Sequence, residues 1–186
     1  MSEATKSKAT DARRTARILD AATRLYITYG ARRTSMDDIA AEAGMAKGSL
    51  YLSFKSKDEL FHALIQNVLQ QWLASAQERL AAESSIVEKL VVYLDATVGE
   101  PTRLLRSTAH AADLLEAKGR VAGDLLFNYR QNITEQVSSL LSDQHSLPTM
   151  VLEAAYGCRE TGDMTPDAYM QRLRRHLAVL LVTEVQ

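Results

Sequence analysis

The sequence predicts an all-α protein of about nine helices, in which a short three-helix domain precedes a larger helical bundle. Of its 186 residues, 46% are hydrophobic, which is enough to fill one sizeable core or two small ones. Only three prolines and eight glycines interrupt the chain. No run alternates between apolar and polar residues as a half-buried strand does, and apolar residues recur instead every three or four positions.

The chain begins with a polar segment that is followed by a first helix. Residues 1–12 have no hydrophobic periodicity, so we expect a flexible arm there. The first helix is predicted from about Asp11 to Tyr29, with Gly30 at its end. Its buried stripe consists of Ile18, Ala22, Leu25, Tyr26 and Tyr29.

The stretch from Thr34 to Lys57 predicts two short helices joined by a tight turn. Ser35 and Asp38 have the spacing of a capping box, in which a hydroxyl and a carboxylate satisfy the free amides of a helix start. Gly44 stands where the first of these helices needs a left-handed residue to end.

The second of these short helices, about Ala46–Phe54, has one inward and one outward face. Leu50 and Phe54 lie four residues apart on the inward face. The outward face carries Lys47, Gly48, Ser49, Tyr51, Leu52, Ser53 and Lys55. Two short helices with the second one presented outward form a helix-turn-helix, the arrangement that places a helix in a DNA groove.

The residue string IAAEAGMAKGSLYLSFKSKDEL closely resembles the DNA-binding signature of the TetR/AcrR family of transcriptional regulators. The resemblance covers about residues 13–65. It departs from the family pattern at Ala46, where a capping Ser or Thr is usual, and at Ser53, where His or Asn is frequent. A missing side-chain cap typically costs about 1 kcal/mol of helix stability. The residues expected to contact DNA are Arg33, Thr34, Ser35, Lys47, Gly48, Ser49, Tyr51, Leu52, Ser53, Lys55 and Lys57.

Charge is distributed unevenly along the chain. Residues 1–57 carry eleven basic and six acidic residues, a formal charge of +5, whereas the remainder carries eleven basic and seventeen acidic residues, a charge of −6. A basic head on an acidic body suits a protein whose head alone meets a polyanion. We therefore expect residues 1–57 to form the DNA-binding domain and residues 58–186 an effector-binding and dimerisation domain.

The remaining helices are expected to form this second domain. A long helix from about Lys57 to Ala82 would belong to both domains. Gly99 and Pro101 are expected to break the chain after the next helix. The helices that follow the long one are predicted at about Ile86–Val98, Thr102–Ala117, Arg120–Ser142, Leu147–Glu160 and Pro166–Glu184.

The family resemblance also implies an effector and a second subunit. Family members bind small molecules among the central helices, and apolar walls with a few polar groups would suit a largely hydrophobic effector. The candidate ligand residues are Trp72, Tyr93, Arg106, His110 and Tyr129. The family pairs its last two helices with those of a second copy, which implies a homodimer that binds a palindromic operator.

The sequence gives little support for a catalytic site or a metal site. The histidines at positions 62, 110, 145 and 176 lack metal-ligand spacing, and we expect no metal, cofactor or catalytic residue. Cys158, the single cysteine, is expected to be a buried structural thiol and fits a reducing compartment. No apolar run approaches the ~20 residues of a membrane span, and no signal peptide is recognisable, so a cytoplasmic location is expected.

These observations favour a homodimeric, ligand-responsive repressor that binds double-stranded operator DNA. Two alternatives stay open. The chain could be an activator, or a regulator that responds to a protein partner rather than to a small molecule. It could also belong to another class, a helical interaction protein without DNA binding. The intact Lys47–Tyr51 run and the +5 charge of residues 1–57 argue against the last alternative.

Overall fold

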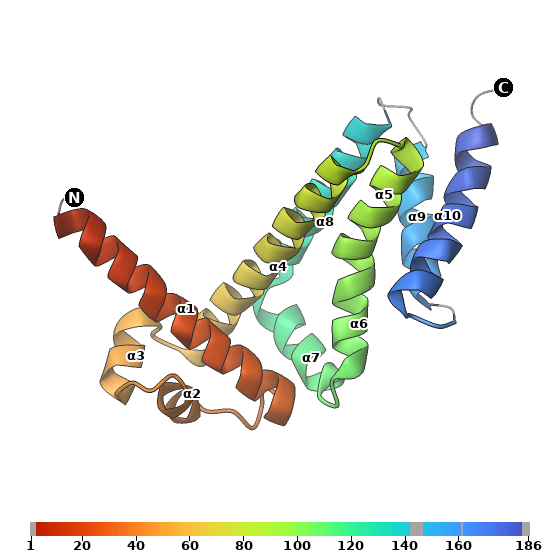
Figure 1. Cartoon of the computed structure of the whole chain (residues 1–186). Coiled ribbons are helices and arrows are strands. Elements are labelled where there is room, and N and C mark those ends of the chain that lie inside the picture. The colour runs from red at the N-terminus through yellow and green to blue at the C-terminus, as the bar shows by residue number, and fades with distance from the viewer. Residues whose placement is uncertain (1–2, 142–146, 161, 184–186) are drawn as a thin grey trace. The chain divides into compact units, whose positions relative to one another are not determined.

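A computed structural model describes residues 3–141, 147–160 and 162–183, and within these ranges the chain forms helices joined by short turns and no β-strand (Figure 1). The segments α5, η1 and α6 follow one another without a break, so the described residues form nine continuous helical rods, as expected. The elements are α1 (Glu3–Tyr29), α2 (Met36–Glu42), α3 (Lys47–Ser53), α4 (Lys57–Ala82), α5 (Ile86–Leu94), the π-helix η1 (Asp95–Gly99), α6 (Glu100–Ser107), α7 (Ala111–Val121), α8 (Gly123–Leu140), α9 (Leu147–Glu160) and α10 (Pro166–Thr183).

The chain divides into two compact units. Unit 1 comprises residues 1–67 and 108–123, and unit 2 comprises residues 68–107 and 124–186. The boundary expected after residue 57 falls at the start of α4, whereas α4 contributes residues to both units. Unit 1 also takes up α7, a helix that the sequence placed in the second domain.

The core of unit 1 forms where α1, α2, α3 and the first turns of α4 bury their apolar faces. Ile18 of α1, Ile39 of α2, Leu50 of α3 and Leu60 of α4 are all fully buried. The rings of Tyr26 and Phe61 pack at a centroid distance of 5.3 Å with an interplanar angle of 58°, a tilted geometry that aromatic pairs favour. This core fixes the two short helices of the helix-turn-helix on the long ones.

Helix α1 begins at Glu3, so residues 3–12 of the segment expected to be a flexible arm are helical, and residues 1–2 lie outside the described residues. The segment EATKSKATDARR lacks apolar periodicity but is rich in Ala, Lys and Arg, which favour helix without any packing partner. An ion pair three residues apart, between Asp11 and Arg14 at 3.0 Å, adds to this local preference. The helix over residues 3–12 is therefore explained by local propensity rather than by a hydrophobic stripe.

The helix predicted at Thr102–Ala117 is instead two helices, α6 and α7, separated at residues 108–110. The Thr108 hydroxyl accepts a hydrogen bond from the backbone N–H of His110 and donates one to the carbonyl of Ile27, both at 3.3 Å. His110 Nε2 lies 3.0 Å from the carbonyl of Thr28. The carbonyls at the end of a helix lack intrahelical donors, so the break in the predicted helix supplies donors to the last turn of α1.

Gly99 and Pro101 do not break the chain, contrary to expectation. Helix α5 continues through η1 into α6. Pro101 has no N–H, so it cannot donate to the carbonyl of Thr97 as residue 101 of an α-helix would. The Tyr129 hydroxyl donates to that carbonyl instead, at 2.9 Å in a buried position. A wider π turn and a donor from α8 thus accommodate the proline within one rod.

Unit 2 has its core between α5, η1, α9 and α10, and α9 and α10 lie side by side (Figure 1). Tyr169, Leu173 and Leu177 of α10 are fully buried. Asp95 of η1 is also buried, and Arg103 pairs with it through two hydrogen bonds of 2.7 and 3.1 Å. A buried carboxylate needs such a partner because desolvation penalises an isolated charge.

Within the described residues, no helix is both long enough and apolar enough to cross a membrane.

Candidate nucleic-acid interface

The turn between α2 and α3 has the geometry that the sequence predicted. The Ser35 hydroxyl accepts a hydrogen bond from the Asp38 N–H at 3.1 Å, and the Asp38 carboxylate accepts one from the Ser35 N–H at 2.8 Å. The Ser35 hydroxyl also donates to this carboxylate at 2.6 Å, and the two hydrogen bonds from the hydroxyl and the N–H of Ser35 lower the pKa of Asp38. Gly44 follows α2 with φ +63, in the left-handed region that glycine adopts without strain. Because Arg17 of α1 donates to the Ala43 carbonyl at 2.6 Å, the end of α2 is anchored on α1.

Helix α3 has one buried and one exposed face. Leu50 is fully buried and holds the helix on the core, whereas the Leu52 side chain is 82% exposed and Tyr51 is 41% exposed. Gly48 is also exposed, and a Cβ built on it would meet no atom of the chain within 4 Å. Ala46 makes no side-chain cap at the start of α3, as its residue type predicted. The exposed face thus presents the apolar side chain of Leu52 to solvent, and a side chain at position 48 would not clash with the rest of the chain.

Lys47 at the start of α3 is paired with the neighbouring helix. Its ammonium group lies 2.8 Å from Oδ1 of Asp37, in the first turn of α2, and 5.9 Å from the centre of the Tyr51 ring. The hydrogen bond to Asp37 raises the pKa of Lys47. Both charged side chains are 59% exposed, so this pair lies at the surface. Asp37 was not among the residues singled out from the sequence, because only the fold brings it to Lys47.

Four other predicted contact residues, Arg33, Ser35, Ser49 and Lys55, keep part or all of their surface in solvent. Two do not present their polar atoms to solvent. Thr34 is buried, and its hydroxyl donates to the Gly30 carbonyl at 2.9 Å. The hydroxyl oxygen of Ser53 is buried and has no hydrogen-bond partner among the described residues.

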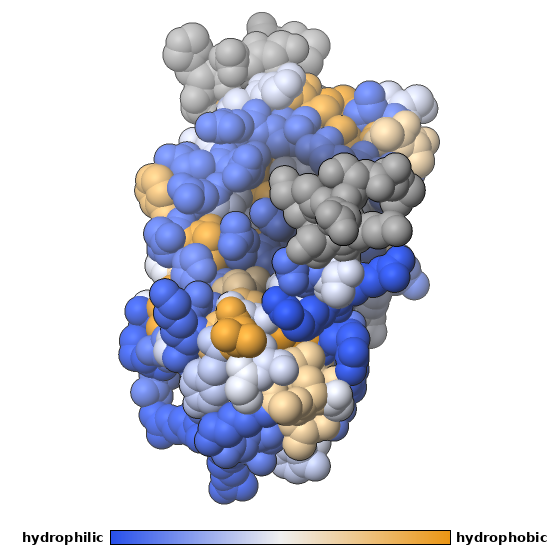
Figure 2. Space-filling view, turned by 90° about the vertical axis from the view of Figure 1, so that its left-hand side faces the viewer, coloured by the Kyte–Doolittle hydropathy of each residue, from blue (hydrophilic) through white to orange (hydrophobic). Residues whose placement is uncertain are grey.

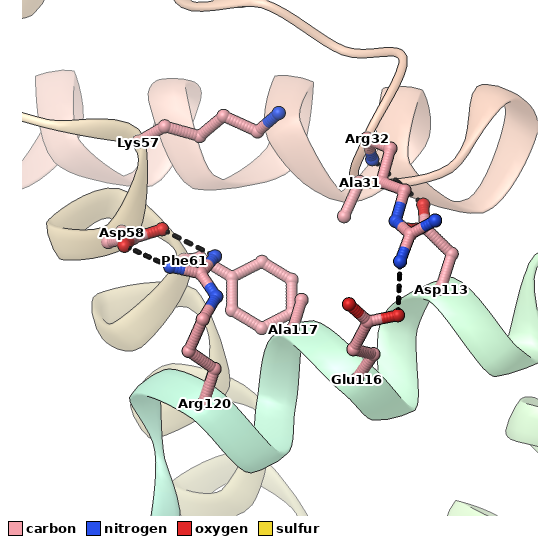
Figure 3. Close-up of a pocket in the computed structure, with 9 residues that line it drawn as sticks. All are labelled: Ala31, Arg32, Lys57, Asp58, Phe61, Asp113, Glu116, Ala117 and Arg120. Atoms are coloured by element: carbon pink, nitrogen blue, oxygen red, sulfur yellow. Dashed lines mark hydrogen bonds and ion pairs between the residues drawn. The ribbon is translucent and has the colours of Figure 1, made fainter.

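Lys57, the last predicted contact, lines a cavity of about 100 Å³ within unit 1 (Figure 3). The walls of this cavity are Ala31, Arg32, Lys57, Asp58, Phe61, Asp113, Glu116, Ala117 and Arg120. Figure 3 shows the Lys57 amine directed away from the ion pair that Arg120 makes with Asp58. Burial lowers the pKa of Lys57 despite the carboxylates around it. Lys57 thus lines a cavity, whereas Tyr51 and Leu52 of α3 are exposed to solvent.

Ion pairs connect α7 to the rest of unit 1 around this cavity. The Arg32 side chain pairs with Glu116 and, at 3.3 Å, with Asp113, which also accepts a hydrogen bond of 2.8 Å from the Arg32 N–H. Arg120 binds Asp58 through both guanidinium nitrogens. The Arg32 contacts hold the turn between α1 and α2, which leads into the helix-turn-helix, and the Arg120–Asp58 pair joins α7 to the start of α4.

Of the five predicted ligand residues, four lie in unit 2 and His110 lies in unit 1. Trp72 packs on Tyr129 at a ring-centroid distance of 6.5 Å, and Tyr93 is 1% exposed, so burial raises its pKa to about 12. Arg106 is exposed and donates to the carbonyl of Arg159 at 2.6 Å. His110 belongs to unit 1, where it contacts the end of α1. Trp72, Tyr93 and Tyr129 are thus aromatic residues of unit 2, and the polar groups of Tyr129, Arg106 and His110 each contact a backbone carbonyl.

Cys158 is buried and its sulfur lies 3.7 Å from Nδ1 of His176. Burial raises the pKa of this thiol, which disfavours the reactive thiolate. In the described part of the chain, no group of three or more His, Cys, Asp or Glu side chains is arranged to hold a metal ion. His145 lies outside the described residues.

The surface is predominantly hydrophilic on the face seen in Figure 2, where hydrophobic side chains emerge in separate small groups. Leu52, with 82% of its side chain in solvent, is the most exposed of the large hydrophobic residues in the described part of the chain. Isolated exposed apolar residues are ordinary. Leu52 differs because it stands on the outward face of a helix-turn-helix beside a lysine and a tyrosine.

Comparison with known proteins places this geometry in one family. The model of bacterial regulatory proteins of the tetR family matches residues 18–64. The transcriptional regulator AcrR of Shigella flexneri is 30% identical over 131 residues, which are 69% of this chain and 54% of that protein. The uncharacterized regulator YhgD of Bacillus subtilis is 36% identical over 63 residues, 34% of this chain and 33% of that protein. The matches thus span about a third to a half of the length of these curated relatives.

Solved structures extend the likeness over nearly the whole chain. A TetR-like transcriptional regulator from Rhodococcus sp. RHA1 has a TM-score of 0.65 and 25% identity, and the alignment covers 91% of this chain and 96% of that one. The matched family model begins in α1 and ends in α4, and it therefore contains the capping box, the Gly44 turn and the exposed face of α3. The chain belongs to the TetR/AcrR family of transcriptional regulators.

Proposed function

We propose that this protein is a DNA-binding transcriptional repressor that acts as a homodimer on a palindromic operator. The observation that carries the proposal is the outward face of α3, where Leu52 and Tyr51 are exposed beside Lys47. An apolar side chain has no favourable partner in water, but in the major groove it can contact the methyl group of thymine. Helix α3 is therefore the proposed recognition helix.

We expect the DNA phosphates to contact both ends of the helix-turn-helix. Arg33 precedes α2 and Lys55 follows α3, and both are exposed. The N–H groups at a helix start, together with the helix dipole, favour an anion. Lys57 is left out of the proposed interface because its amine lines the cavity of unit 1. Phosphate contacts position the protein, so sequence preference is assigned to the residues of α3.

Dimerisation through α9 and α10 is proposed from their outer surface. A shallow groove of about 660 Å³ runs along these helices and is lined by Met150, Glu153, Ala154, Arg172, Arg175, His176, Val179 and Leu180. The side chains of Met150 and Val179 are 41% and 65% exposed. A two-fold pair presents the same apolar patch from both copies and would place two α3 helices on half-sites about one helical turn apart.

A small-molecule effector, as the family resemblance implies, would bind among the helices of unit 2 and change the affinity for DNA. Tyr129 and Arg106 already donate hydrogen bonds to the backbone carbonyls of Thr97 and Arg159, so an effector would have to compete with these bonds or bind beside them. An activator, or a regulator that answers to a protein partner, would have the same interface with DNA. The sign of the change in reporter expression when the gene is deleted separates repression from activation.

A gel shift with the DNA upstream of the protein's own gene tests the proposal. We expect a complex that contains two chains per site and that survives competition by random-sequence duplex. Leu52→Ala is expected to weaken binding to the specific site about five- to tenfold, or roughly 1 to 1.4 kcal/mol, and to leave binding to random duplex nearly unchanged. Leu104→Ala is the matched control, because Leu104 is also exposed, at 46%, but lies on α6.

Two results would contradict this reasoning in different ways. Equal weakening of specific and random binding by Leu52→Ala would mean that Leu52 does not read bases. A strictly monomeric protein that binds no fragment at low salt would refute the proposed function as a whole.

A further inference from the structure

The ion pair between Asp37 and Lys47 joins the two helices of the helix-turn-helix across their outer surface. The Lys47 ammonium is 2.8 Å from one carboxylate oxygen of Asp37 and 2.9 Å from the other. The adjacent Asp38 is occupied differently, since its carboxylate accepts hydrogen bonds from the N–H and the hydroxyl of Ser35. Of two neighbouring carboxylates, Asp38 therefore caps α2 and Asp37 holds the cation at the start of α3.

This pair contributes little to folding. Both side chains are 59% exposed, and exposed pairs gain little because water competes for the same charges. The same exposure leaves the ammonium accessible to a third charged group. Its position 5.9 Å from the Tyr51 ring centre puts it beside the exposed face of α3, where the proposed function requires DNA to approach.

We propose that Asp37 competes with DNA phosphates for the Lys47 ammonium and thereby lowers the affinity of this chain for duplexes of any sequence. The proposal rests on the proposed function and assigns a role to a residue that the function did not use. When a duplex reaches α3, Lys47 can remain on Asp37 and neutralise no phosphate. Otherwise it moves to a phosphate and leaves an unpaired carboxylate beside the DNA backbone. Binding is weakened in either case.

The expected size of the effect follows from counterion release. A lysine that neutralises one phosphate of duplex DNA changes the slope of log K against log salt by about −0.9. Extrapolated from 1 M salt, where electrostatic binding is largely lost, one such contact corresponds to about an eightfold gain in affinity at about 0.1 M. Removing the competitor should therefore raise affinity for a random duplex by up to about eightfold and steepen the slope by up to about 0.9.

The test measures binding of the full-length protein to a labelled random-sequence duplex by fluorescence anisotropy at several salt concentrations. The variants are Asp37→Asn, Lys47→Ala, the combination of both, and Asp37→Glu. Asp20→Asn is the matched control, because it removes the same charge from an exposed position on α1. Thermal melts followed by circular dichroism verify that each variant is folded, which the surface position of the pair predicts.

We expect Asp37→Asn to raise affinity and steepen the salt slope clearly more than Asp20→Asn does. The gain should disappear when Lys47→Ala is added, and Asp37→Glu should bind like the wild type because a carboxylate remains near Lys47. The proposal is overturned if Asp37→Asn and Asp20→Asn behave alike, or if the gain persists without Lys47, while the wild type still binds DNA. If neither the wild type nor any variant binds a duplex at low salt, the proposed function itself fails.

Discussion

Replacing Tyr129 by Phe tests whether this tyrosine supports the fold or serves an effector. The substitution removes one hydroxyl and leaves the ring, which packs on Trp72, in place. That hydroxyl donates to the carbonyl of Thr97 at 2.9 Å, and Tyr129 is only 8% exposed. A buried acceptor that loses its donor costs about 1–3 kcal/mol. For a chain of this length, such a loss lowers the melting temperature by about 2–12 °C.

A second substitution shows where the need for that hydroxyl comes from. Pro101 cannot donate to the Thr97 carbonyl, whereas alanine at position 101 restores an N–H four residues beyond it. We therefore expect the loss caused by Tyr129→Phe to be smaller by about 0.5–1 kcal/mol when Pro101→Ala is already present. A double-mutant cycle measured by urea unfolding and circular dichroism gives this coupling. Tyr29→Phe serves as the control because Tyr29 is 55% exposed. If Tyr129→Phe leaves the free energy of unfolding unchanged, or if the two substitutions add independently, the structural role assigned to Tyr129 is wrong.

Two further predictions concern recognition and pH. Gly48→Ala should raise the free energy of unfolding by up to about 1 kcal/mol, because alanine favours helix and its Cβ meets no atom of the chain. The same substitution should weaken DNA binding if α3 approaches the DNA backbone closely. Thermal melts measure the first effect and fluorescence anisotropy the second, and unchanged binding would remove Gly48 from the interface. Burial raises the pKa of Tyr93 from 10.0 to about 12, so the folded state holds the phenolic proton more tightly than the unfolded state does. The contribution of Tyr93 to the free energy of unfolding is therefore intact below pH 10 and declines as the pH rises towards 12. The slope approaches about 1.4 kcal/mol per pH unit for Tyr93 alone, and Tyr93→Phe should flatten the measured dependence of unfolding free energy on pH; an unaltered dependence would mean that burial of Tyr93 does not cause it.

Local patterns predicted most of the helix-turn-helix correctly. The Ser35–Asp38 capping box, the left-handed Gly44 and the uncapped start at Ala46 depend on residues within three or four positions of one another. Helix α9 has the bounds expected from its pattern, Leu147–Glu160, and α4 begins and ends within a residue of expectation. In each case, the forces that define the element act within one or two helical turns.

The errors arose where partners distant in sequence decide the outcome. The split between α6 and α7 depends on the free carbonyls of Ile27 and Thr28, some 80 positions away. The cavity around Lys57 exists because α7 folds onto unit 1. Hydrophobic periodicity carries no information about such pairings.

The π-helix η1 also determines which side chains of α6 point inward. A π turn holds about one residue more than an α turn, and each added residue rotates whatever follows by roughly 100° about the axis. Gly99 suits this site because a Cβ there would collide with Asp95 and crowd Tyr169. A residue gained or lost between positions 95 and 99 would therefore rotate α6 about its axis relative to α5 and change which of its side chains face the rest of unit 2.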